Sequence, residues 1–178
     1  MSATSTFAVA APQTSDECRV LIVDDDRDFA DGLADFLNLH GYRAEVAYDA
    51  DEALARCETL EPGIAIFDIR LGVGSGLDLM QRLQDQRPEL LSIAATGYAN
   101  IETAIEAIRK GAYDYLRKPL HNDEILIVLE RGFERLRLEE NKRTAEEALQ
   151  MSEERFRDFA EASADWFWAT DAEHHFTY

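Results

Sequence analysis

The segment Val20–Phe29 reads VLIVDDDRDF, and within it a buried strand gives way to a run of negative charge. Its four leading apolar residues, VLIV, are typical of a strand that is covered on both faces. Three consecutive aspartates follow, and the segment then takes on the spacing of an amphipathic helix. Like charge gathered beside a buried strand indicates either a helix cap or a site that binds something positive.

The composition narrows the classes of protein that this chain can belong to. It has 178 residues, 46% of them hydrophobic, which is enough for one domain of ordinary size and a further segment. Against 18 Lys and Arg stand 36 Asp and Glu, a formal net charge of −18 that disfavours nucleic acid and anionic membrane and attracts cations. No apolar run approaches the length of a membrane span, and Cys18 and Cys57 are expected to be unpaired thiols of a cytoplasmic protein.

Short apolar runs alternate with helix-length segments over two thirds of the chain. The predicted strands are Arg19–Val23, Ala44–Tyr48, Ile64–Phe67, Leu91–Ala95 and Tyr113–Leu116. Asp49 has the position of an N-cap for the helix after the second strand. The alternation predicts an α/β domain over residues 18–138, with a doubly wound, five-stranded parallel sheet. Ligands of such sheets bind outside the carboxyl ends of the strands.

That rule places several carboxylates at one edge of the predicted sheet. Asp24, Asp25 and Asp26 follow the first strand, and Asp68 follows the third. Carboxylates this close raise one another's pKa unless a positive charge intervenes, and oxygen ligands suit a hard cation such as Mg2+. The alternative is that the aspartates cap the following helix. We favour the cap for Asp26 and the metal site for Asp24 and Asp25.

Two further strand ends carry reactive side chains. Thr96 closes the fourth strand and Lys118 closes the fifth, while Gly97 leaves room beside the threonine. Singly, such a threonine is usually a cap, and a Lys-Pro pair is usually part of a loop. Together with a metal, a hydroxyl and an ammonium suit the oxygens of a phosphoryl group, and a lone aspartate can be the nucleophile that becomes an acyl phosphate.

These residues resemble the receiver domain of two-component response regulators, a flavodoxin-like fold. The acidic pair at Asp24 and Asp25, Asp68, Thr96, and Lys118 followed by Pro119 match the family's pattern over about two thirds of the chain. The resemblance implies that Asp68 accepts a phosphoryl group from a histidine kinase or phosphotransfer protein, in a signalling domain that is not itself an enzyme.

The resemblance also implies finer roles at this edge of the sheet. Mg2+ would be bound directly by Asp25 and Asp68, through water by Asp24, and by the backbone carbonyl of Arg70. The bond before Pro119 would be cis. Tyr115 would be the aromatic switch that responds when Thr96 moves toward the phosphate.

The loop after the third strand departs from the family's pattern. Gly72 stands where the family usually has proline, and three glycines give IRLGVGSG, Ile69–Gly76, more backbone freedom than proline would allow. Arg70 and Tyr98 occupy positions that vary in the family and tune the lifetime of the phosphate.

A long helix is predicted after Pro119, capped by Asn122 or Asp123 and continuing to about Ala160. The predicted buried side is formed by Ile125, Leu126, Val128, Leu129, Phe133 and Leu136, and no glycine or proline interrupts residues 139–160. An imperfect heptad seam there comprises Ala145, Leu149, Ser152, Phe156 and Phe159. We expect this linker to form a weak parallel homodimer, with a solvated single helix as the alternative.

The two ends of the chain are read differently. Residues 1–17 are expected to be a disordered tail. Residues 161–178 are rich in aromatic residues and resemble the opening of a PAS sensory domain, so we interpret the chain as a piece of a longer protein, such as a hybrid histidine kinase or another signalling enzyme. His174 and His175 lack partner ligands nearby in the sequence and are expected at the surface.

We therefore predict a receiver in a phosphorelay that passes its signal through the long helix to a sensor or output module. One rival is a metal-dependent phosphatase that forms a covalent aspartyl phosphate, although it would need an acid where Arg70 stands. The other is a receiver-like interaction module that is never phosphorylated, although it would be expected to lack part of the acidic, hydroxyl and lysine set.

Overall fold

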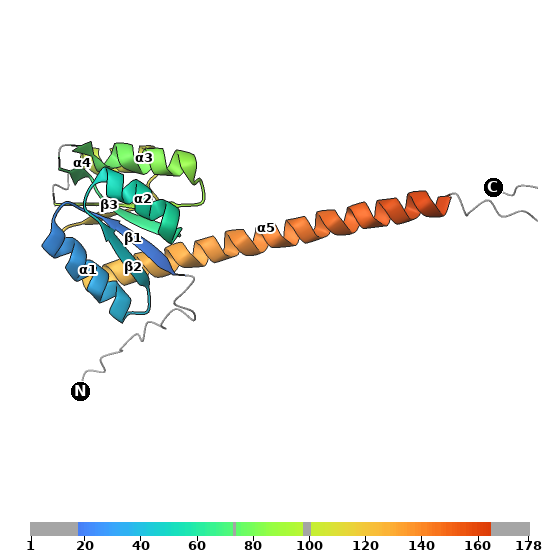
Figure 1. The fold of residues 1–178 in the computed structure, drawn as a ribbon, viewed down its shortest axis with the longest axis horizontal. Helices are drawn as coiled ribbons and strands as arrows, with labels where there is room; N and C mark the ends of the chain where they lie inside the picture. The colour runs from blue at the N-terminus through green and yellow to red at the C-terminus, as the bar shows by residue number, and fades with distance from the viewer. Residues whose placement is uncertain (1–17, 73, 98–100, 165–178) are drawn as a thin grey trace, which may run out of the picture. The chain divides into compact units, whose positions relative to one another are not determined.

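The fold is taken from a computed structural model that describes residues 18–72, 74–97 and 101–164 (Figure 1). A five-stranded parallel sheet has the order β2-β1-β3-β6-β7. Its strands are β1 (Arg19–Val23), β2 (Arg43–Ala47), β3 (Ile64–Asp68), β6 (Leu91–Thr96) and β7 (Asp114–Arg117). The predicted sheet is confirmed, with β2 and β7 each starting one residue away from the predicted position.

Helices cover both faces of the sheet. They are α1 (Arg27–Leu39), α2 (Ala50–Leu60), α3 (Gly76–Gln86), α4 (Ile101–Arg109) and α5 (Asn122–Ala164). Alternate residues of each central strand face opposite sides, so that Ile22 and Ile66 pack with α1 and α5 while Leu21 and Phe67 pack with the other three helices. The helices and strands therefore form a doubly wound fold, in which ligands bind at the carboxyl ends of the strands.

Two local features differ from the prediction. The loop after β3 contains a small antiparallel pair, β4 (Arg70–Leu71) with β5 (Gly74–Ser75), where no strand was expected. Strands this short give no periodic signal in a sequence. Helix α5 begins at Asn122 itself, so neither Asn122 nor Asp123 precedes it as a cap.

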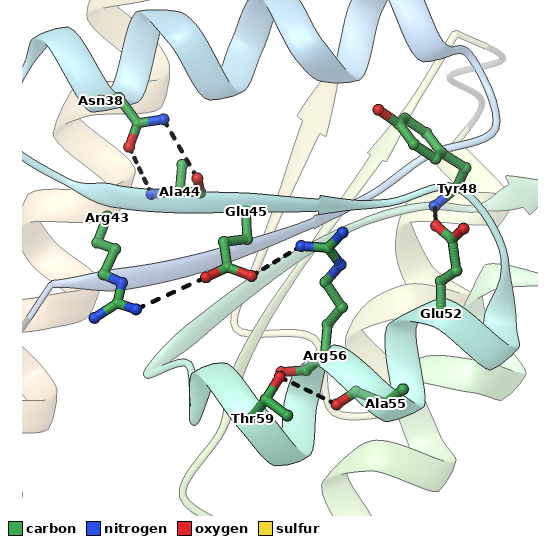
Figure 2. A network of polar contacts seen from close by, with 9 residues as sticks. All are labelled: Asn38, Arg43, Ala44, Glu45, Tyr48, Glu52, Ala55, Arg56 and Thr59. Carbon is green, nitrogen blue, oxygen red and sulfur yellow. Dashed lines mark hydrogen bonds and ion pairs between the residues drawn. The ribbon is translucent and has the colours of Figure 1, made fainter.

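The edge strand β2 is tied to both neighbouring helices (Figure 2). The Asn38 side chain of α1 accepts a hydrogen bond from the Ala44 N–H at 2.9 Å and donates one to the Ala44 carbonyl at 3.3 Å. Glu45 pairs with Arg56 of α2 at 2.9 Å. The Asn38 side chain thereby occupies the N–H and carbonyl of Ala44, which an exposed edge strand would otherwise offer to another strand.

Helix α5 belongs to two units of the chain, the first ending at Leu136 and the second beginning at Arg137. In the first, Ile125, Leu126, Val128, Leu129 and Phe133 are buried and Leu136 is half-buried, which confirms the predicted buried side. In the second, residues 137–159 are exposed throughout. The helix continues past the predicted end at Ala160 and includes the first residues of the segment assigned to a PAS opening.

The core contains both cysteines, Cys18 and Cys57, as buried thiols that form no disulfide. None of the helices in the described ranges combines the length and apolarity that a membrane crossing requires. The predicted tail, residues 1–17, and the aromatic segment from 165 onward lie outside the described residues.

Candidate functional site

The carboxyl ends of the central strands bring the predicted site residues to one edge of the sheet. Asp24 follows β1, Asp68 ends β3 and Thr96 ends β6. Lys118 follows β7, and its backbone N–H donates to the Thr96 carbonyl at 2.9 Å. Parallel pairing in register therefore aligns residues that lie far apart in the sequence.

Three carboxylates form the acidic part of the site. Asp24, Asp25 and Asp68 each offer an oxygen, and these oxygens all lie within 4.8 Å of one another. Asp24 is almost fully buried, with 2% of its surface exposed, whereas Asp68 is half-buried and Asp25 is exposed. An all-oxygen set of this size, open on one side, fits a hard divalent cation that retains some of its water.

Lys118 joins these carboxylates from the end of β7. Its ammonium donates to Oδ2 of Asp24 and, at 2.7 Å, to Oδ2 of Asp68. The other oxygens are also occupied, because the Asp26 N–H donates to Asp24 Oδ1 at 3.1 Å and the Arg70 N–H donates to Asp68 Oδ1 at 3.0 Å. The carboxylates of Asp24 and Asp68 are therefore each held by a backbone N–H and by the lysine.

Burial and charge act in opposite directions on this pair. Burial raises the pKa of the Asp24 carboxyl, although the hydrogen bond and charge of Lys118 work to lower it. Burial works to lower the pKa of Lys118, but its bonds to Asp24 and Asp68 outweigh burial and raise that pKa above its usual value. The lysine is therefore a fixed cation at neutral pH, and the site favours additional positive charge near Asp24.

A model of one family matches residues 20–130 of the chain, and its description is the response regulator receiver domain. The chain belongs to that family. Among known relatives, the acid tolerance regulatory protein ActR of Sinorhizobium medicae is 39% identical over 142 residues, which cover 79% of this chain and 73% of ActR. The family's members are phospho-accepting signalling domains, and their phosphodonor partners are histidine kinases.

Solved receiver structures agree with the fold. A CheY-like receiver domain protein from Methanospirillum hungatei superposes with a TM-score of 0.64 and 33% identity, covering 68% of this chain and 97% of that one. A response regulator from Burkholderia pseudomallei superposes with a TM-score of 0.60 and 36% identity, covering 68% of this chain and 72% of that one. That structure was solved with a phosphorylated aspartic acid, a calcium ion and citrate.

The remaining predicted residues of the receiver lie as follows. Thr96 is buried and Tyr115, on β7, is half-buried. The Tyr115 hydroxyl is buried and has no hydrogen-bond partner among the described residues. The peptide bond before Pro119 is cis. Tyr98 lies outside the described residues, and Arg70 is exposed.

The three glycines in the loop after β3, Ile69–Gly76, have different surroundings, which the sequence did not distinguish. Gly72, at the position usually held by proline, has a φ of 53°, a left-handed conformation that favours glycine. A Cβ at Gly76 would lie 1.7 Å from the Asp68 carbonyl oxygen. The Gly76 N–H also donates to the Ile69 carbonyl at 2.9 Å, which closes the loop behind Asp68.

Two residues complete the description of this edge. Asp26 is the N-cap of α1 and accepts from the Phe29 N–H at 3.2 Å, which confirms the expected cap. Phe29 was not predicted to take part, yet the Lys118 ammonium lies 4.2 Å from the centroid of its ring. From helical spacing alone, Phe29 is expected only to pack in the core. The spacing cannot show its contact with Lys118, because that contact also depends on where β7 ends.

Proposed function

We propose that this receiver accepts a phosphoryl group on Asp68 from a phosphohistidine donor. The observation that carries the assignment is the placement of the Asp68 carboxylate, 2.7 Å from the Lys118 ammonium and within 4.8 Å of two further carboxylates. The lysine then neutralises charge on the incoming phosphoryl oxygens. The Thr96 hydroxyl donates to one of those oxygens, since Thr96 ends the strand that adjoins β3.

The proposed transfer involves one bond formed and one broken. A carboxylate oxygen of Asp68 attacks phosphorus, and the P–N bond to the donor imidazole breaks as the new O–P bond forms. The imidazole nitrogen keeps the electron pair and takes a proton from solvent. Hydrolysis later releases inorganic phosphate and restores the carboxylate.

Mg2+ is the metal that we propose for the acidic cluster. Asp25 and Asp68 would hold it directly, Asp24 through water, and the Arg70 backbone carbonyl would add a further oxygen. When bound, the ion supplies positive charge for the phosphoryl oxygens. The all-oxygen donor set and the exposure of Asp25 support this choice.

Binding of a phosphoryl mimic tests the metal and the acceptor together. Beryllofluoride is expected to bind only when Mg2+ is present, and calorimetric titration should show no binding to Asp68→Asn. Asp26→Asn is the matched control, because Asp26 is a neighbouring acid that caps α1, and asparagine caps as well as aspartate. Binding that survives in Asp68→Asn, or without Mg2+, contradicts the proposal.

The switch roles of Thr96 and Tyr115 are also part of the proposal. A phenol whose buried hydroxyl lacks a partner among the described residues is in an unfavourable position, so a second orientation is accessible at low cost. Phosphorylation would favour one orientation only through a difference in affinity. Tyr115→Phe should therefore fold normally and change the response of α4 resonances to beryllofluoride.

For the second unit we propose a weak parallel homodimer along the seam. Leu149, Phe156 and Phe159 are 61%, 72% and 70% exposed, which is unusual for residues of this size on a helix. The net charge of −18 opposes association, so dimerisation should strengthen as salt screens the repulsion.

Sedimentation with and without beryllofluoride tests this pairing. Leu149→Asp should abolish dimerisation, whereas Met151→Asp, an equally exposed residue off the seam, should weaken it much less. An unchanged equilibrium in every sample would make the helix a passive spacer. The PAS opening at residues 161–178 is a proposal that rests on the resemblance to such domains, and a cytoplasmic location is one that rests on the two cysteines, which form no disulfide.

A further inference from the structure

The Lys118 side chain has an apolar neighbour as well as its carboxylate partners. Its ammonium lies 4.2 Å from the centroid of the Phe29 ring, a distance at which a cation is attracted to the face of an aromatic ring. Only 15% of the lysine side chain is exposed, so little water competes for the contact. Two carboxylates and one ring therefore surround a group that has three donors.

Phe29 is itself held by two features of the fold. Its backbone N–H donates to the capping carboxylate of Asp26, which fixes the first turn of α1. Its ring packs against the core. The ring also lines a hollow of about 280 Å³ between α1 and the start of α5, together with Leu33, Phe36 and Ile125. The first turn of α1 and the packing against the core thus place the ring beside the lysine.

We propose that Phe29 is a positioning residue for phosphoryl acceptance, because its ring keeps the Lys118 ammonium over the carboxylates. Lysine carries its charge on a flexible four-carbon chain, so its placement depends on the groups around it. Carboxylates alone allow the ammonium to move from one oxygen to another. The ring face limits that movement without taking up a hydrogen bond that the phosphoryl group needs. This inference rests on the proposed role of Lys118 at Asp68.

Substitution of Phe29 tests the rate of acceptance. Phe29→Leu removes the ring and keeps an apolar side chain, and we expect phosphorylation by phosphoramidate to slow about three- to tenfold. Phe29→Tyr keeps the ring face and should stay within about twofold of the original rate. Phe36→Leu is the matched control, since Phe36 lies on the same helix and lines the same hollow. Equal losses in Phe29→Leu and Phe36→Leu would overturn the proposal.

A spectroscopic measurement separates this role from simple packing. A ring beneath the ammonium shifts the ε-methylene proton resonances of Lys118 upfield by its ring current. The shift should disappear in Phe29→Leu and in Phe29→Met, a second variant in case leucine disturbs the fold, and should persist in Phe36→Leu. An unchanged shift in both Phe29 variants overturns the contact.

A double-mutant cycle completes the test. In a Lys118→Gln background the ring has no cation to hold, so Phe29→Leu should slow phosphorylation no further. A full additional loss in that background overturns the coupling. The resonance shift can be measured without phosphorylation, so it tests the contact separately from the proposed acceptor. If the shift is present and the Asp68→Asn variant is still phosphorylated, the proposed acceptor is contradicted and the contact between Phe29 and Lys118 stands.

Discussion

The two parts of α5 show how one helix can be stabilised in two ways. Its first part, residues 122–136, buries five apolar side chains against the sheet, with Leu129 fully buried. Its second part, residues 137–164, has only exposed side chains through residue 159 and pairs such as Arg143 with Glu140 at 2.7 Å. Burial therefore holds the first part, whereas local pairs and propensity hold the second. No glycine or proline stands at the junction between residues 136 and 137. The sequence therefore does not show that the source of the helix's stability changes there.

The largest expected effect is the removal of a buried side chain from the first part. Leu129→Ala should lower the free energy of unfolding by about 2–5 kcal/mol, because it deletes methyl groups from a filled core. Leu149→Ala is the matched change in the second part, and it should cost less than about 0.5 kcal/mol in dilute monomer. Urea denaturation measures both, and similar losses would mean that the two parts do not differ.

The next effect uses pH. Tyr42 stacks on Phe133 of the first part at 5.8 Å, and burial, with Cys18 and Glu130 nearby, raises its pKa from 10.0 to about 12. Between these values the unfolded chain has lost a proton that the folded chain keeps. The free energy of unfolding should therefore fall by about 2–3 kcal/mol as pH rises from 10 to 12.

Tyr42→Phe provides the control for this titration. The substitution keeps the stacked ring and removes the ionisable group, so denaturation midpoints of the variant should fall less steeply over the same pH range. Parallel slopes for the two proteins would show that the phenol does not report the packing of α5.

A smaller effect is expected from the glycine of the first part. A Cβ at Gly132 would lie 2.7 Å from Cδ1 of Ile64, so Gly132→Ala should be destabilising by about 1 kcal/mol despite the higher helix propensity of alanine. In the second part, Ser152→Ala should stabilise slightly, because Ser152 is exposed and alanine has the higher helix propensity. Thermal denaturation followed by circular dichroism shows whether each substitution raises or lowers stability. A Gly132→Ala variant that is more stable than the original protein would mean that α5 is packed loosely.

The smallest effect concerns the ion pairs of the second part. Arg143 pairs with Glu140 at 2.7 Å and with Glu147 at 4.0 Å, and its side chain is 67% exposed. Arg143→Ala should reduce helical content only slightly and change the free energy of unfolding by less than about 0.5 kcal/mol. A larger loss, abolished by salt, would indicate that the pairs act as a network.

Sequence reasoning was most successful where a residue's place follows from the ends of strands. Asp24, Asp68 and Lys118 meet, and Thr96 ends a neighbouring strand, because parallel strands in register end on one side of the sheet, and apolar runs identify such strands well. The cap at Asp26 and the continuation of α5 beyond residue 138 followed from local rules of the same kind.

What escaped prediction depends on contacts between elements. The approach of Phe29 to Lys118 joins α1 to the end of β7, and no spacing in the sequence encodes the distance between them. The burial that raises the pKa of Asp24 also depends on the assembled core. The β4–β5 pair consists of two-residue strands, too short for any periodicity. The three glycines of the loop were treated as equivalent, whereas their surroundings differ.

The lack of space for a Cβ at Gly76 should limit which variants of the loop after β3, residues 69–76, directed evolution can return. A library that randomises residues 69–76 and selects for phosphoryl acceptance should return glycine at 76, where a Cβ would meet the Asp68 carbonyl oxygen at 1.7 Å. Position 74 should accept many residues, because its nearest contact would be 3.6 Å away. If Asp68 forms the proposed acyl phosphate, variants that alter its lifetime are best sought at Arg70, whose side chain is exposed.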